Sequence, residues 1–493
     1  MPRAIKIRLE LIMTSVAIAA PPLDYARLRI PAAAFELLVC LVIVAAASLA
    51  FLAGWLTVKG AIVLTVLLLG SLIVLSWIHL GQGRHPVFLF LCTLMLFQGG
   101  RLLAYCLGSM SDPLSIGLMR EFPFAVSRNV SATVLLCLAL SALCVYIPCR
   151  WNFRSVPPPL NTAARRYLPY LYLVYAGSLP FLFYKNYLYF RYIQENGGYI
   201  AFFSDYANLV ANVPLIVRLM ALLPLPVLLL IFVFETQKKL LYAVVILYFA
   251  GSIVLMLSGT RMGPFSLVLT LWYVASTKSG KTPRVWRLAL LATVLIVVAN
   301  LIALARFGED IEGRSAVDPV SFVATQGVSL GVSEVAIMHA DAFRPYVFSY
   351  LLHELQIEFV QADVSNYFPG RQFGYDVSVF LNPALFSQGF ATSGAYPGEA
   401  YLWGGIAGVV AISLLIGRGL RLLYECSSNI KLLAVVAFVL PQVLLLPRGF
   451  LLGWLSSLLR AFLVLMPMAL GWCLYNFVIR HLQASPRPEL TTS

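Results

Sequence analysis

Apolar residues occur in long, nearly continuous runs separated by short polar segments. Most runs approach the roughly 20 residues that a helix needs to cross a bilayer core. They do not alternate apolar with polar positions, which excludes a transmembrane β-barrel. The pattern predicts an all-α polytopic membrane protein with about twelve transmembrane helices and a long, partly helical extracytoplasmic loop. We expect the helix cores at 33–54, 60–80, 87–107, 130–148, 167–186, 214–234, 239–257, 263–277, 288–305, 398–417, 432–446 and 454–478.

Composition agrees with a membrane protein. Hydrophobic residues make up 60% of the chain and charged residues 11%, and the mean hydropathy is +0.87. A soluble fold of this length does not need so much apolar surface. The eight cysteines lie almost all in or beside expected spans, and the largest polar loop contains none, so no disulfide framework is expected.

Basic residues gather in alternate loops and fix the expected orientation, because short cytoplasmic loops are rich in Lys and Arg. These loops carry Arg150, Arg154, Arg165, Arg166, Lys238, Lys239, Lys278, Lys281, Arg284, Arg287, Arg418, Arg421 and Lys431. Both termini then face the cytoplasm. The net charge of +14 is explained by topology and an anionic inner leaflet, and no nucleic-acid partner is required.

This orientation predicts five regions. They are a cytoplasmic amphipathic N-terminus (1–30), the first nine helices (31–306), a large periplasmic loop (307–397), the last three helices (398–480) and a cytoplasmic tail (481–493). A cleaved signal peptide within the first 23 residues would invert every later loop, so the charge pattern argues against one.

The stretch 247–277 joins two apolar helical runs at a short polar break that contains Arg261. Arg261 is therefore expected near one membrane face. A guanidinium held there is costly without an anionic partner. A phosphate or diphosphate group fits, because Arg binds phosphate oxygens in a bidentate manner, although the same position also suits a topological anchor.

The expected outer segments are rich in aromatic and turn residues. Within 307–397, helical patterns cover 319–340 and 346–361, and the remainder is rich in Gly, Pro, Asn and Tyr. A second outer loop, 187–213, has the same character. Aromatic faces of this kind stack on sugar rings, although a simple cap over the bundle would show the same composition.

The sequence lacks the motifs of ATP-driven transporters, zinc proteases and metal-dependent nucleotide-sugar enzymes. There is no GxxxxGK[ST] loop for ATP, no HExxH zinc motif and no DxD pair for a metal-bound nucleotide sugar. The two halves show no internal repeat, and acids are scarce inside the expected spans, which weighs against common transporter folds.

Five segments resemble, in order, the Wzy-type polymerases of O-antigen and exopolysaccharide repeat units. They are NGGYIAFFSDYA (196–207), SGTRMGP (258–264), TQGVSLGVSEV (325–335), LNPALFSQGFATSGAYPGEAYLWGGIAG (381–408) and LPRGFLLGW (446–454). The resemblance covers about 180 to 455, and the earlier part matches only in hydropathy. ATSGAYPGE departs from the family pattern, where a more serine-rich run would stand.

The resemblance implies a metal-independent glycosyltransferase of the bacterial inner membrane that uses no cofactor. It would polymerise undecaprenyl-diphosphate-linked oligosaccharides at the periplasmic face, with a flippase and a chain-length regulator as further candidate partners beside the lipid bilayer. Positive groups would stabilise the diphosphate leaving group, and a carboxylate or His would act as the base.

Candidate residues follow from these roles. Glu399 leads as the base, because it lies where a polar outer loop re-enters the membrane, with His353 and Glu354 next. That adjacent pair points about 100° apart on a helix, so one member at most would face the site. The candidate catalytic residues are Glu399, Arg261, His353 and Glu354, and the candidate diphosphate- and substrate-binding residues are Arg306, Arg371, Arg448, Tyr396, Tyr401 and Tyr199.

Three alternatives stay open. An O-antigen ligase-like glycosyltransferase would use a similar donor but transfer it to a lipid A core, with a His near the chemistry. A polysaccharide or lipid exporter would transport without glycan synthesis and tolerate loss of the outer arginines. A non-enzymatic scaffold is disfavoured by the arginines at the edges of the spans.

Fusions of a compartment-sensitive reporter test the orientation. A reporter after Gly313 or Asp376 should read extracytoplasmic, and one after Lys281 or Arg421 cytoplasmic, because the charge bias orients the spans. An opposite reading at any one of the four positions would contradict the charge argument.

Overall fold

The structure is a computed structural model that describes most of 56–114, 127–158, 167–196, 205–257, 262–281, 319–356, 367–389 and 391–484, with scattered positions in 42–54 and 286–298. Within these residues the chain forms helices and connecting turns and no strand, which confirms the all-α prediction. The predicted amphipathic N-terminus, most of the predicted spans 33–54 and 288–305, and residues 485–493 lie outside the described residues.

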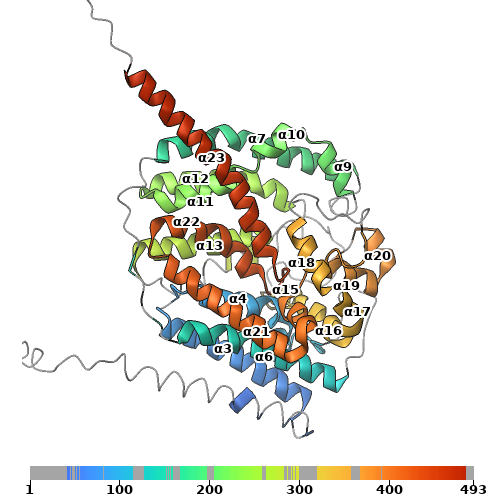
Figure 1. The fold of residues 1–493 in the computed structure, drawn as a ribbon. Coiled ribbons are helices and arrows are strands. Elements are labelled where there is room, and N and C mark those ends of the chain that lie inside the picture. Colours follow the sequence, from blue (N-terminus) through green and yellow to red (C-terminus); the bar gives the residue numbers. More distant parts are fainter. Residues whose placement is uncertain are drawn as a thin grey trace, which may run out of the picture.

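The helices lie in stacked layers that α23 crosses at a steep angle (Figure 1). Those of the first half are α3 (Val58–His79), α4 (Pro86–Phe97), α5 (Gly100–Cys106), α6 (Arg128–Arg150), α7 (Leu168–Glu195), α9 (Tyr206–Ala211), α10 (Leu215–Met220), α11 (Pro224–Phe234), α12 (Lys238–Leu257) and α13 (Met262–Ser279). Those of the second half are α15 (Pro319–Gln326), α16 (Ser329–Met338), α17 (Ala340–Phe343), η4 (Arg344–Tyr346), α18 (Val347–Gln356), α19 (Phe373–Leu381), α20 (Pro383–Ser387), α21 (Tyr396–Cys426), α22 (Ile430–Leu445) and α23 (Gly453–Ala484).

Polar residues begin several helices by capping free backbone N–H groups. The Thr57 hydroxyl accepts a hydrogen bond from the Gly60 amide at 3.1 Å at the start of α3. The Asn429 side chain accepts from the Lys431 amide at 2.9 Å at the start of α22. These caps place helix ends at the boundaries of the apolar runs.

Five helical segments are long and apolar enough to cross a membrane, or six if the bent pair α4–α5 counts as one span, among the described residues. The expected cores at 60–80, 130–148, 214–234 and 398–417 coincide with four of them, and 87–107 coincides with the bent pair. The count of about twelve stays a prediction.

The remaining segment among the five, Pro319–Met338, lies within the predicted outer loop. A helical pattern was expected there, and the structure divides it into α15 and α16 at Gly327–Val328. α15 packs against α5, and α16 packs against α6 and α21. This part of the loop segment is therefore integrated into the bundle.

Among the described helices, α6 and α21 form the most extensive contact. A Cβ at Gly417 would lie 2.4 Å from the Val145 carbonyl oxygen, so only glycine permits this approach. The Cys149 thiol donates to the Gly417 carbonyl at 3.2 Å. Small residues at such contacts let membrane helices approach backbone to backbone.

A second, smaller core lies beside the main one. It joins side chains of α16–α19 with the start of α21, among them Val335, Phe343, Tyr350, Phe373 and Leu402. The segment 367–389, expected as irregular loop, contains the short helices α19 and α20. In Figure 1 α16–α20 gather at one end of the layers.

Helices break at three places around this end of the bundle. α4 and α5 meet at a bend of 66°, and α15 and α16 meet at Gly327–Val328. α21 is interrupted at Gly404–Gly405, where Gly405 has φ 61° and ψ −143°, a conformation that is open essentially to glycine alone. The residues 396–403 therefore form a separate short helical segment.

Gly327→Ala tests the close contact between α5 and the end of α15. Its Cβ would lie 2.4 Å from the Arg101 backbone nitrogen, so we expect destabilisation of about 1–3 kcal/mol and a lower thermal unfolding midpoint in detergent. Gly177→Ala on α7 is the matched control, since its Cβ meets nothing within 4 Å. Equal midpoints for the two variants would show that the crossing tolerates a side chain.

Candidate functional site

The Glu399 side chain lies at the first turn of α21 and is 7% exposed. One carboxylate oxygen, Oε2, accepts a hydrogen bond from the Leu451 amide at 3.0 Å. The other, Oε1, has no hydrogen-bond partner among the described residues. A buried carboxylate with an unused oxygen is costly to stability and is able to accept a proton from a substrate hydroxyl.

Leu451 belongs to the loop between α22 and α23, residues 446–452, which we call the α22–α23 loop. The loop also carries Arg448, whose Nη1 donates to the Gln326 side-chain oxygen at 2.7 Å. The Arg448 guanidinium lies 5.8 Å from the centre of the Phe97 ring. Arg448 and Glu399 therefore both lie at this loop, as the sequence led us to expect of residues at re-entry points.

Polar side chains from the two broken helix pairs complete the surroundings of the loop. Gln98 donates to the Pro447 carbonyl at 2.6 Å and accepts from the Ser333 hydroxyl at 3.1 Å. We call this group the polar crossing, and its members are Gln98, Arg101, Gln326, Ser333, Glu334 and Arg448.

The polar crossing contains a second buried carboxylate, Glu334. Its side chain is 0% exposed, and neither of its oxygens has a hydrogen-bond partner among the described residues. Arg101, also buried, interacts with it electrostatically. An ionisable pair inside an apolar bundle is expensive and usually marks a functional region.

Close packing connects Glu334's helix to Glu399's helix. A Cβ at Gly398 would lie 3.0 Å from the Ser333 Cα and from the Ala336 Cβ. α16 and the first turn of α21 are thus in direct contact, and the two buried carboxylates belong to one region of the structure.

A third carboxylate, Asp376, lies on α19 near the same end. Its Oδ2 accepts from the Tyr350 hydroxyl at 2.7 Å and from the Gly370 amide at 2.8 Å. Its Oδ1 accepts from the Tyr367 hydroxyl at 3.0 Å. Burial raises the pKa of Asp376 above its ordinary value, while these three hydrogen bonds oppose the rise by favouring the charged form.

Tyr350 contacts both Asp376 and the pocket that contains Glu399. A small pocket is lined by Tyr350 and Glu399, together with Leu351, Trp403 and Leu452. The Tyr350 hydroxyl is bound to Asp376, so one aromatic side chain separates the Asp376 cluster from the Glu399 carboxylate.

The structure also places the other predicted residues of the outer segments. Arg371 is buried, with its guanidinium 5.7 Å from the centre of the Phe368 ring. The His353 ring lies 4.9 Å from the same ring, and Glu354 follows on α18. These residues belong to the part of the chain around Asp376.

The predicted tyrosines are placed differently from one another. Tyr396 is 0% exposed and packs near Phe90 in the main core, so it does not present a free face. Tyr401 is partly buried against both cores. Arg261, Arg306 and Tyr199 lie outside the described residues.

Sequence reasoning missed most of the polar crossing. Gln98, Gln326 and Glu334 were not among the candidate residues, and neither was Arg101, which lies inside the expected span 87–107. That charge was the available signal, because an Arg within an apolar helix needs a partner. Glu334 lay in a segment read as outer loop, where an acid is unremarkable.

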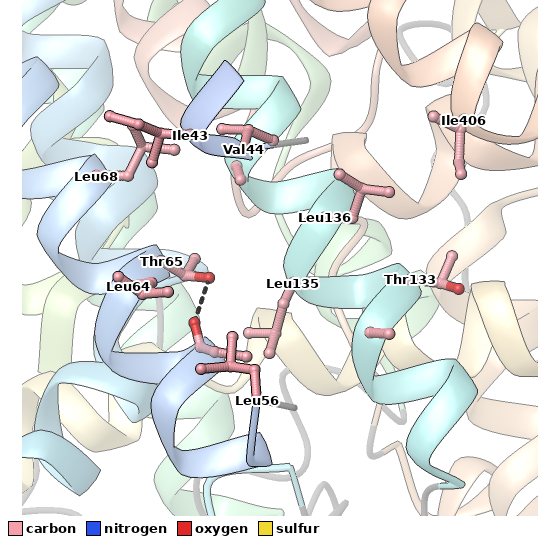
Figure 2. A pocket seen from close by; sticks show the side chains of 13 residues that line it. Ile43, Val44, Leu56, Leu64, Thr65, Leu68, Thr133, Leu135, Leu136 and Ile406 are labelled. Atoms are coloured by element: carbon pink, nitrogen blue, oxygen red, sulfur yellow. Dashed lines mark hydrogen bonds between the residues drawn. The ribbon is translucent and has the colours of Figure 1, made fainter. Parts of the chain in front are cut away.

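An additional apolar pocket of about 150 Å³ lies between α3 and α6, with Ile406 of α21 at one side (Figure 2). The Thr65 hydroxyl in it is bonded to the Ala61 carbonyl at 2.9 Å. None of the described lining residues is ionisable, so this pocket offers no acid or base.

Comparison with known proteins gives one family. The family model described as O-antigen polysaccharide polymerase Wzy matches residues 35–475. No curated protein and no solved structure matches the chain. The match covers most of the chain, including residues 35–170, where only hydropathy had suggested a relationship.

Tyr350→Phe tests the Asp376 cluster through its pH dependence. Loss of the hydroxyl should lower the free energy of unfolding by about 1–3 kcal/mol at neutral pH. The variant should also raise the pKa of Asp376 further, because a bond that favours the charged form is gone.

The sign of the pH effect follows from linkage. The deficit of Tyr350→Phe relative to wild type is largest where Asp376 is ionised in both proteins, and shrinks as the pH falls through the folded pKa values, which lie above the ordinary Asp value. Unfolding midpoints across pH measure this, with Tyr346→Phe as the control, since Tyr346 packs against Tyr350. A deficit independent of pH would mean that the hydroxyl acts only through packing.

Proposed function

The chain belongs to the O-antigen polysaccharide polymerase Wzy family, and from this we propose that it polymerises undecaprenyl-diphosphate-linked oligosaccharide repeat units at the periplasmic face of the bacterial inner membrane. The product would be O-antigen or exopolysaccharide. Family membership and the apolar helices support a multi-pass membrane enzyme of polysaccharide biosynthesis. The proposal adds the donor, the membrane face, cytoplasmic termini, and a flippase and a chain-length regulator as partners.

The observation that supports the chemistry best is the Glu399 carboxylate. It is buried at a break between a helix and a loop, accepts a hydrogen bond from the Leu451 amide, and keeps Oε1 without a side-chain hydrogen-bond partner among the described residues. A carboxylate that served only to stabilise the helix N-terminus would do so in contact with solvent, without the free-energy cost of burial. We assign Glu399 the role of general base.

The leaving group requires positive charge. Arg448 lies on the loop that holds Glu399, and Arg101 lies in the polar crossing beside it. We propose that Arg448 binds the diphosphate, together with Arg261, Arg306 and Arg371 from the outer segments. Arg101 is a further candidate, which Glu334 positions. Arginine suits this role because its planar donor fork matches phosphate oxygens.

The proposed step is a displacement at the anomeric carbon of the donor. The acceptor hydroxyl oxygen forms a bond to that carbon, and the carbon–oxygen bond to the diphosphate breaks. The bonding electrons leave with the lipid diphosphate, and the hydroxyl proton passes to Glu399 Oε1. Arginine charges stabilise the negative charge as it develops on the leaving oxygen.

The Asp376 region is the proposed sugar-binding side. It offers a buried carboxylate with two tyrosine hydroxyls, and Tyr401 and Tyr199 would add aromatic faces; Tyr396 would act from the core by placing the first turn of α21. His353 and Glu354 remain the alternative bases if Glu399 is not used.

Reconstitution tests the function directly. Purified protein in nanodiscs, supplied with lipid-linked repeat units, should produce lipid-linked chains of increasing length without nucleotide sugars. Transfer of a finished chain to lipid A core, with no chain growth, would identify a ligase instead. Movement of lipid-linked glycan across the membrane without any new glycosidic bond would identify an exporter.

Glu399→Gln should lower the rate of chain growth by roughly 10²–10⁴-fold, the usual contribution of a general base. The amide keeps the shape and is able to accept the Leu451 hydrogen bond, so folding and binding of lipid-linked repeat units should survive. Chain length on gels and the binding affinity, measured on the same preparation, separate these effects.

Gly394→Ala provides a second variant at the same carboxylate. Its Cβ would lie 2.6 Å from Glu399 Oε1 and 2.6 Å from Phe450 Cδ1. Both side chains should shift, so chain growth should also fall. Gly177→Ala is again the matched control. Near-normal growth by Glu399→Gln would remove Glu399 from the mechanism and direct attention to His353, Glu354 and Asp376.

A further inference from the structure

A long apolar groove of about 600 Å³ follows α21 and α22 and ends at the α22–α23 loop. Its volume lies within the roughly 300–1,000 Å³ that ligand sites occupy. None of the described residues that line it carries a charged, hydroxyl or amide side chain, and Trp403 and Trp454 supply its only aromatic groups. Such a surface suits a hydrocarbon chain and offers no charged group to a phosphate.

The groove continues into the site that contains Glu399. Four residues line both the groove and the small pocket of Glu399 and Tyr350, namely Leu351, Trp403, Leu451 and Leu452. Leu451 also donates its backbone hydrogen bond to Glu399. A chain lying in the groove would therefore place its polar end at Glu399 and at the loop that carries Arg448.

The groove is long in comparison with an ordinary lipid chain. Its lining residues on α21 extend from Trp403 to Leu423, a distance of roughly 30 Å at 1.5 Å per residue, somewhat less because of the break at Gly404–Gly405. The hydrocarbon core of a bilayer is about 30 Å thick, so a phospholipid acyl chain spans about half of it.

The outer wall of the groove is open. Leu415 and Leu422, which line it, are 71% and 45% exposed, and they belong to an apolar helix able to cross a membrane. The groove is thus accessible from the side, where the bilayer lies, and a chain need not pass through the polar end to enter it.

We propose that this groove binds the polyprenyl chain of the lipid-linked substrate and so delivers its diphosphate to the α22–α23 loop. The inference rests on the proposed function, and it adds where the lipid lies. The occupant is a polyprenyl diphosphate rather than a phospholipid, because the groove has the length of a membrane-spanning chain and continues into the pocket of the buried Glu399 carboxylate, beside the loop that carries Arg448. The pocket of Figure 2 is also largely apolar but shares no residue with the Glu399 pocket.

Gly419 gives a clean handle on the groove. It lines the groove, and a Cβ added there meets nothing within 4 Å, so Gly419→Phe should fill the groove without disturbing neighbouring helices. Phe also has a higher helix propensity than Gly. Gly177→Phe on α7 is the matched control, because Gly177 is an exposed helical glycine with the same open surroundings outside the groove.

Photolabelling measures occupancy independently of catalysis. The probe is undecaprenyl diphosphate with a diazirine at the far end of its chain, in nanodiscs of phosphatidylethanolamine and phosphatidylglycerol. Labelled peptides should come from α21 and α22. Gly419→Phe should lower this labelling by about tenfold, equivalent to about 1.4 kcal/mol of binding, and Gly177→Phe should leave it unchanged.

Competition identifies the occupant. Unlabelled undecaprenyl diphosphate should suppress labelling, and excess phosphatidylglycerol should not. Labelling that persists in Gly419→Phe, or that phosphatidylglycerol suppresses equally, would overturn the proposal.

Donors of two chain lengths separate this inference from the proposed function. Gly419→Phe should lose chain growth with an undecaprenyl-linked donor and retain it with a geranyl-linked donor, whose short chain does not reach Gly419. Equal loss with both donors would place the defect at the reaction and overturn the groove. If wild-type protein elongated neither donor but was still labelled in α21 and α22, the polymerase assignment would fail while the groove remained.

Discussion

In an apolar helical bundle, every interrupted helix frees backbone groups that need hydrogen-bond partners, and lipid provides none. The arrangement around the α22–α23 loop follows from this constraint. Gln98, beside the break in α4–α5, bonds the Pro447 carbonyl, and the Leu451 amide finds the Glu399 carboxylate. The broken helices lie close together, so polar groups beside one break form hydrogen bonds with backbone or side-chain groups beside another. A loop that satisfies backbone groups thereby brings together the charged groups of the proposed reaction site.

Glycine makes this meeting possible. At Gly100 and Gly327 the backbones of two broken helices approach so closely that a Cβ on either would lie 2.4 Å from a backbone atom of the other segment. At Gly405 the backbone adopts a conformation that turns the short segment 396–403 away from the rest of α21. The Gly100–Gly327 contact brings Arg101 to α15–α16. The Gly405 conformation sets the direction of the short helical segment that carries Glu399. Removing either would separate side chains that are far apart in sequence.

The sequence was a good guide where the physics is local. Apolar runs of spanning length predicted α3, α6 and α21. The roles of Glu399 and Arg448, chosen for their places where outer segments meet the spans, stay predictions. The sequence was a poor guide where the outcome depends on which segments meet. The run 319–340 is helical as expected, yet its burial against α5 and α21 has no local signature. Tyr396 illustrates the same limit, because it was a candidate substrate-binding residue, whereas the first turn of α21 directs its ring into the core.

The two properties required of a lipid-linked substrate site, an apolar surface and fixed charge, are divided between different parts of the chain. The groove residues of α21 beyond Gly405 and of α22 carry only hydrocarbon, and the first turn of α21 and the α22–α23 loop provide the polar groups. The break at Gly404–Gly405 lies at the boundary between the two parts. If α21 were continuous, residues 396–403 would lie on the same axis as the rest of the helix, and Glu399 would not be directed toward the α22–α23 loop. The kink allows a single helix to contact the bilayer along most of its length and to end at a buried carboxylate. For this reason the backbone conformation of one glycine determines how the hydrophobic and the charged parts of the proposed site are joined.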